Sequence, residues 1–91
     1  LRVGNYLMTE LTEMKGCFAS IVDVRGCGLL VAMEFDTDLA EALVLACMQR
    51  GLLLNRVKPN AIRFLPPLIV MEKEVDEALS ILREALQDLG G

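Results

Sequence analysis

The stretch AIRFLPPLIV, residues 61–70, places an arginine in a short apolar strand pattern just before two prolines. If Ile62 and Phe64 face a core, then Ala61, Arg63 and Leu65 face the other way, because successive strand residues alternate between faces. A guanidinium is a planar, permanently charged fork that suits two-point binding of a carboxylate. The rigid Pro66-Pro67 corner would hold that fork in place. Arg63 is therefore the candidate ligand-binding residue; the alternative is an arginine on the solvent side of an ordinary strand.

Other kinds of site lack their residues. There is no histidine and no CxxC. A Ser-His or Cys-His nucleophile pair would therefore lack its general base, and a zinc site would lack its ligands. The three cysteines, Cys17, Cys27 and Cys47, are too few and too widely spaced for a disulfide framework. We expect small buried thiols in a reducing, cytoplasmic compartment. No metal site and no self-contained hydrolytic site is predicted.

Two further patterns have simple structural interpretations. The glycines at 26 and 28 do not form a dinucleotide-binding GxGxxG, because Val31 stands where the third glycine is needed. Asp38 with Glu41 three residues on is typical of a capping box at the start of a helix. The acidic residues at 72–77 fit the start of another helix, where the macrodipole favours negative charge.

Composition limits the classes of partner. The chain has 91 residues, 54% of them hydrophobic, and a formal net charge of −4. That charge argues against nucleic acid and anionic membranes as partners, and no apolar stretch approaches the roughly 20 residues of a membrane span. The apolar content is high for a small domain, which indicates surface that is covered by something outside this chain. The start lacks an initiator methionine, so we expect a domain of a longer chain.

Periodicity predicts an α+β fold of order α-β-β-α-β-β-α, with a small antiparallel or mixed sheet and helices on one face. The first helix is expected over 3–15, with a stripe of Val3, Leu7, Leu11 and Met14. Two strands, 21–24 and 29–35, are separated by a glycine-containing turn at 25–28. A helix from about 38 to Arg50, apolar on all sides at 42–48, precedes the strands 52–54 and 61–65. The last helix carries an apolar face of Val75, Leu79, Leu82, Leu86 and Leu89.

Three stretches together resemble a known family. VDVRGCGLLVAMEF (22–35), ACMQRGLLLNRV (46–57) and AIRFLPPLIVMEKEVDEALSILREAL (61–86) look like the C-terminal small domain of class III pyridoxal-phosphate-dependent aminotransferases. The form IRFLPPL is most similar to the acetylornithine and ornithine aminotransferases. The resemblance covers nearly the whole chain, in the order and spacing of that family.

The resemblance implies roles for two arginines. The family's arginine at the position of Arg63 binds the α-carboxylate of the substrate, and the one at the position of Arg25, in VRGxGL, is mainly structural. This sequence departs from the family at Cys27, where lysine is usual, and at Met71, where a Ser or Thr helix cap is common. Neither departure touches the expected site.

The resemblance also implies what this chain does not supply. The family's Schiff-base lysine and its pyridoxal phosphate site lie in a large domain, and none of Lys15, Lys58 or Lys73 stands in a matching motif. Arg63 is then the substrate-binding residue, with no catalytic, cofactor-binding or metal-binding residue in residues 1–91.

The expected enzyme transfers an amino group from acetylornithine or a similar ω-amino donor to 2-oxoglutarate, as in arginine biosynthesis. Its partners would be its own large domain, a second copy in a homodimer, and the amino acid and 2-oxo acid substrates. The alternative is a free-standing α/β regulatory module that oligomerises and binds an amino acid.

Overall fold

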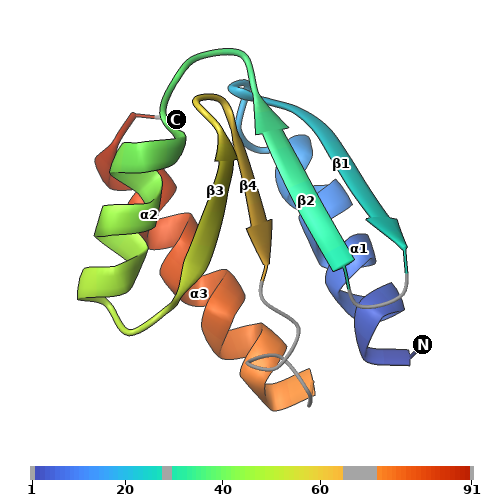
Figure 1. Ribbon diagram of the computed structural model, residues 1–91. Coiled ribbons are helices and arrows are strands. Elements are labelled where there is room, and N and C mark those ends of the chain that lie inside the picture. Colours follow the sequence, from blue (N-terminus) through green and yellow to red (C-terminus); the bar gives the residue numbers. More distant parts are fainter. Residues whose placement is uncertain (1, 28–29, 65–71, 91) are drawn as a thin grey trace.

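In the computed structural model, the described residues form a four-stranded antiparallel sheet with three helices on one of its faces (Figure 1). The structure describes residues 2–27, 30–64 and 72–90. The elements in chain order are α1 (Arg2–Lys15), β1 (Ile21–Cys27), β2 (Leu30–Phe35), α2 (Ala40–Gln49), β3 (Leu54–Lys58), β4 (Ala61–Phe64) and α3 (Glu72–Asp88). The strand order is β1-β2-β4-β3. The predicted order of elements is confirmed, and every strand pair is antiparallel.

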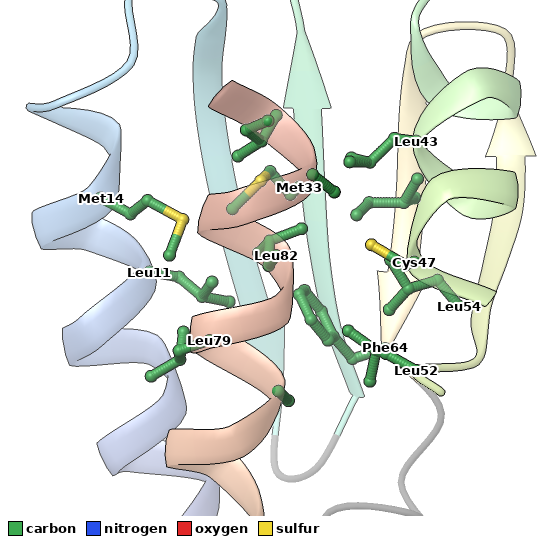
Figure 2. Close-up of a cluster of buried hydrophobic side chains, with 14 of the residues drawn as sticks. Leu11, Met14, Met33, Leu43, Cys47, Leu52, Leu54, Phe64, Leu79 and Leu82 are labelled. Carbon is green, nitrogen blue, oxygen red and sulfur yellow. The ribbon is translucent and has the colours of Figure 1, made fainter. Parts of the chain in front are cut away.

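The core lies between the sheet and the helix layer. Figure 2 shows α3 between α1 and α2, with the strands behind them. Leu11 and Met14 come from α1, Leu82 from α3, and Leu43 and Cys47 from α2, and all five are fully buried. The sheet contributes mainly Val31, Met33, Phe35, Ile62 and Phe64. Most of the aliphatic residues read from the sequence of the first and last helices therefore face one shared core, namely Leu7, Leu11, Met14, Val75, Leu79, Leu82 and Leu86. The side chain of Val3 lies outside the described residues.

β1 is longer than the sequence indicated. The residues expected to form a turn from Arg25 onward continue the strand, and Gly26 pairs with Val31 of β2. Gly26 does not have a positive φ. A Cβ at Gly26 would lie 2.6 Å from the Sδ of Met8 on α1. The glycine is needed for close packing of helix on strand, not for a turn.

β3 begins later than the sequence indicated. The run of leucines at 52–54 suggested the strand, but the structure places the strand at Leu54–Lys58. Leu52 is buried ahead of the strand and Leu53 is exposed. β3 pairs with β4 through a bulge between Arg56 and Lys58. The prediction from hydrophobic residues placed this strand too early, because Leu52 is buried although it lies outside the sheet.

α2 starts without the predicted capping box. The residue before the helix is Leu39, and no side chain caps its first turn. The backbone N–H of Ala40 instead donates to the carbonyl of Pro59, at 3.1 Å. A backbone group from the β3–β4 turn therefore satisfies an N–H that Asp38 was expected to serve. The predicted end of α2 is confirmed, with Gly51 at φ 92°.

Two helix surfaces differ from simple stripes. Leu45 and Met48 of α2 are 50% and 49% exposed, although the sequence is apolar on all sides there. Leu89, expected on the buried face of the last helix, lies beyond the end of α3 and is 40% exposed. Ala78 and Ala85 complete the buried face of α3 instead. Among the described helices, none is both long and apolar enough to cross a membrane.

Candidate functional site

Arg63 lies on β4, which is flanked by β2 and β3 in the sheet. Its neighbours Ile62 and Phe64 are 0% and 1% exposed and belong to the core, whereas Arg63 is exposed. The guanidinium therefore extends from the face of the sheet that carries no helix, hereafter the open face. The predicted alternation along this strand is confirmed for these three residues.

Ala61 shares the open face with Arg63 but is only 4% exposed. It pairs with Glu34 of β2 on one side and with Lys58 of β3 on the other. Both of these neighbours have longer side chains that can cover a methyl group between them. An alanine on the open face is thus buried without joining the hydrophobic core.

The sheet fixes the backbone of Arg63 from both sides. Its partners across the two neighbouring strands are Ala32 on β2 and Asn55 on β3. A strand with ladders on both edges has fewer free backbone groups than an edge strand and is held more firmly. The arginine is presented from an ordered platform, while its small neighbours leave space around the guanidinium. The proline corner at Pro66-Pro67 and its apolar rim, Leu65 and Leu68, lie outside the described residues.

Arg25 occupies the open face two strands away from Arg63. Its Nε lies 3.1 Å from Oδ2 of Asp23, and one terminal nitrogen donates to Oε1 of Glu34 at 2.8 Å. This arginine links β1 to β2 and partners two carboxylates. Within the described part of the chain, no ion pair or hydrogen bond involves the side chain of Arg63. Arg25 and Arg63 therefore differ: Arg25 pairs with two carboxylates, whereas Arg63 has no ion-pair partner among the described residues.

Glu34 and Asn55 are the residues near Arg63 that the sequence did not single out. Both are brought there by strand register, and the register depends on β4 inserting between β2 and β3. A sequence signal exists for Glu34, because it is a charged residue inside the otherwise apolar strand Leu30–Phe35. No comparable signal marks Asn55.

The cysteines only partly follow the prediction of buried thiols. Cys47 is fully buried, and burial raises the pKa of its thiol from 9.0 to about 11. Cys17 is exposed, which corrects the prediction for that residue, because it lies just past the end of α1. The side chain of Cys27 is outside the described residues. A neutral thiol such as that of Cys47 is a poor nucleophile.

Other surface features lie away from Arg63. A hollow between α1 and α3 is lined mainly by polar side chains, among them Glu10, Asp76 and Arg83. It belongs to the helix side of the molecule, opposite the open face. In the residues 2–27, 30–64 and 72–90, no cluster of three or more acidic or cysteine residues could hold a metal ion.

The chain's lysines do not form a site for a cofactor that binds as a Schiff base. Lys15 ends α1, Lys58 ends β3 and Lys73 lies in the first turn of α3, and all three are exposed to solvent. A lysine that forms a Schiff base is normally lowered in pKa by burial or a neighbouring cation. None of these three lysines is therefore placed to hold pyridoxal phosphate, the cofactor that class III aminotransferases generally use, as a Schiff base.

Comparisons of the chain with known proteins all match aminotransferases. The family model described as "Aminotransferase class-III" matches residues 1–86. Acetylornithine aminotransferase of Caldanaerobacter subterraneus subsp. tengcongensis is 41% identical over 94% of this chain and 22% of the relative. The acetylornithine aminotransferase of Bifidobacterium longum is 48% identical over 75% of this chain and 16% of the relative.

A solved structure agrees with the sequence comparison. Acetylornithine aminotransferase from Elizabethkingia anophelis has a TM-score of 0.85 and 30% identity, covering 96% of this chain and 24% of that protein. The chain thus spans about a fifth to a quarter of the relatives it matches over nearly its full length. The matching family model, the identities and the fold together show that this chain belongs to the class III aminotransferase family.

Proposed function

We propose that residues 1–91 form the C-terminal small domain of an acetylornithine-type aminotransferase and that Arg63 binds a carboxylate of its substrates. The observation that carries this proposal is an exposed arginine on a strand paired on both edges, with no ion-pair partner among the described residues. Membership in an aminotransferase family favours this function over a free-standing regulatory module.

The charges of the open face support an anionic ligand at this place. The charge of Arg25 is offset by Asp23 and Glu34, whereas Lys58 adds positive charge on the strand beside Arg63. The β3–β4 half of the face therefore favours carboxylates. A guanidinium can bind one carboxylate with two parallel hydrogen bonds. Both an amino acid donor and 2-oxoglutarate have an α-carboxylate to offer.

The remaining chemistry belongs outside these residues. We place the Schiff-base lysine and pyridoxal phosphate in a large domain of the same protein, where the cofactor supplies the electron sink for transamination. The large domain and a second copy in a homodimer would cover apolar surface such as Leu45 and Met48. The donor is proposed to be acetylornithine or a similar ω-amino compound, because the relatives are named acetylornithine aminotransferases. A role in cytoplasmic arginine biosynthesis is part of the same proposal.

The test is steady-state kinetics of the full-length protein with Arg63→Ala and Arg63→Lys. Charged hydrogen bonds contribute about 1.5–3 kcal/mol each, so Arg63→Ala should raise KM for 2-oxoglutarate and for the amino donor about ten- to hundredfold. Arg63→Lys should lose less, because it keeps the charge but not the fork. Cofactor absorbance should stay unchanged in both variants.

Arg56→Ala is the matched control. Arg56 is also exposed, but it lies on β3 opposite Ile62 and so extends from the other face of the sheet. Its replacement should leave both KM values near wild type. If Arg63→Ala behaves like Arg56→Ala, Arg63 does not bind substrate. A loss of thermal stability without a change in KM would assign Arg63 a structural role.

A further inference from the structure

The register of the sheet arranges the open-face side chains in two parallel rows. Residues opposite one another across each strand pair define the rows. The first row contains Arg25, Ala32, Arg63 and Asn55. The second row contains Asp23, Glu34, Ala61 and Lys58. Each row crosses all four strands, so one glutamate has arginines on both sides of it.

Glu34 is a diagonal neighbour of both arginines. Ala32 pairs with Arg25 on one side and with Arg63 on the other, and Glu34 stands two residues further along the same strand. Diagonal neighbours in an antiparallel sheet lie about 7–8 Å apart, within reach of long side chains. Geometry alone therefore allows Glu34 to pair with either guanidinium.

The structure shows which arginine Glu34 pairs with. Oε1 of Glu34 lies 2.8 Å from a terminal nitrogen of Arg25, and Asp23 approaches the Nε of the same arginine at 3.1 Å. Arg25 thus forms ion pairs with both Asp23 and Glu34 on the open face. Arg63 is left without an ion pair among residues 2–27, 30–64 and 72–90.

An ion pair between Glu34 and Arg63 would compete with substrate. A carboxylate that binds Arg63 would first have to displace the carboxylate of Glu34. The apparent affinity would then be the intrinsic affinity multiplied by the fraction of molecules in which Arg63 is unpaired. An ion pair between Glu34 and Arg25 avoids this loss of substrate affinity.

We propose that Arg25 is a positioning residue that holds Glu34 away from Arg63, so that the Arg63 guanidinium stays free for a substrate carboxylate. This inference rests on the proposed function of Arg63. It gives Arg25 a part in substrate binding besides the joining of β1 to β2, although its side chain need not touch the substrate.

The experiment measures KM for 2-oxoglutarate and kcat in the full-length holoenzyme, with four variants. Arg25→Gln releases Glu34, and should raise KM about two- to fivefold at nearly constant kcat, the effect of one solvent-exposed ion pair. The double variant Arg25→Gln/Glu34→Gln removes the competitor and should return KM to within about twofold of wild type. Asp23→Asn leaves the Arg25–Glu34 pair in place and should have no effect. Arg63→Ala tests the proposed function separately.

The outcomes are distinguishable. If Arg63→Ala leaves KM unchanged, the proposed function fails and this inference fails with it. If Arg63→Ala raises KM but Arg25→Gln does not, only this inference is wrong. If Arg25→Gln raises KM and the double variant stays equally high, Arg25 acts through the structure of the sheet and the inference is also wrong.

A second pair of variants keeps the test decisive if Arg25→Gln does not fold. Arg25→Lys keeps the charge but holds Glu34 at a single point. It should still raise KM above the wild-type value, and Glu34→Gln in the same chain should remove the rise. Wild-type KM in Arg25→Lys, or a rise that Glu34→Gln does not remove, overturns the inference.

Discussion

The hydroxyl of Tyr6 on α1 donates a hydrogen bond to Oδ1 of Asp76 on α3, at 2.5 Å. It joins helices from opposite ends of the sequence on the outer side of the helix layer. This hydrogen bond is the main reason that the pKa of Tyr6 is raised from 10.0 to about 12, with smaller contributions from desolvation and from the charges of Asp76, Glu10 and Glu72.

The raised pKa of Tyr6 can be measured directly, because the chain has one tyrosine and no tryptophan. Tyrosinate absorbance should appear near pH 12 in the folded chain, and near pH 10 in denaturant. Asp76→Asn should lower the pKa of Tyr6 toward 10, since it removes the acceptor's negative charge. Folding favours the neutral phenol, so this contribution to stability is present below pH 10 and is lost as the pH rises toward 12. Circular dichroism at each pH is the control for unfolding, and equal pKa values in the two chains would contradict the prediction.

Arg50 should stabilise the contact between α2 and α3. It lies just past α2, and its Nε is 3.1 Å from Oε1 of Glu84 while a terminal nitrogen pairs with Asp88. Another terminal nitrogen donates to the carbonyl of Ala46, at 2.9 Å. Arg50→Ala should lower the free energy of unfolding by about 1 kcal/mol in denaturant titrations, because ion pairs near the surface contribute modestly.

Arg83→Ala is the control for that measurement. Arg83 is an exposed arginine on α3, and none of the described residues forms an ion pair with it. Its replacement should change stability by no more than about 0.5 kcal/mol. Equal effects of the two replacements would show that the interhelical ion pairs contribute nothing measurable.

Gly26→Ala should reveal the close packing of α1 on β1. The new methyl group would lie 2.6 Å from the Sδ of Met8 and 3.1 Å from its Cγ, so the methionine must shift. In the otherwise unchanged chain, we expect Gly26→Ala to lower the free energy of unfolding by about 1 kcal/mol. In a chain that also carries Met8→Ala, Gly26→Ala should raise the free energy of unfolding by about 0.5 kcal/mol, because alanine is more stable than glycine within a strand. Additive effects in the double variant would refute this contact.

Cys17 and Cys47 should differ in reactivity. Cys17 is exposed, whereas Cys47 is fully buried and the pKa of its thiol is raised to about 11. A thiol reagent at pH 8, followed by peptide mapping, should label Cys17 first and Cys47 only on unfolding. In denaturant both should react at similar rates. Fast labelling of Cys47 in the folded chain would contradict the burial of its side chain.

The order of elements was predictable because each has a local signal. The stripes of α1 and α3 have a helical period over many residues, and Gly51 ends α2 with the positive φ that glycine tolerates. The face of Arg63 was also predictable, since Ile62 and Phe64 are large and apolar and must be buried together.

The features that the sequence did not predict correctly depend on contacts between residues far apart in the chain. The N–H of Ala40 is satisfied by Pro59, so a favourable capping sequence at Asp38 was not used. Gly26 is explained by Met8 on another element. The neighbours of Arg63 depend on β4 pairing with β2, and no local pattern specifies that pairing. Interactions of this kind are decided by tertiary packing and leave little trace in a single sequence.

The strand order also bears on how the chain folds. Strands β1 and β2, and strands β3 and β4, are each close in sequence, so each pair can form by closing a short loop. The β2–β4 ladder joins the two pairs and must close a loop that contains α2. Pairings between residues far apart in sequence cost more chain entropy and slow folding. Arg63 meets Ala32, and comes within reach of Glu34, only in this ladder, so the open face around the arginine is completed by the strand pairing that closes the longest loop within the sheet.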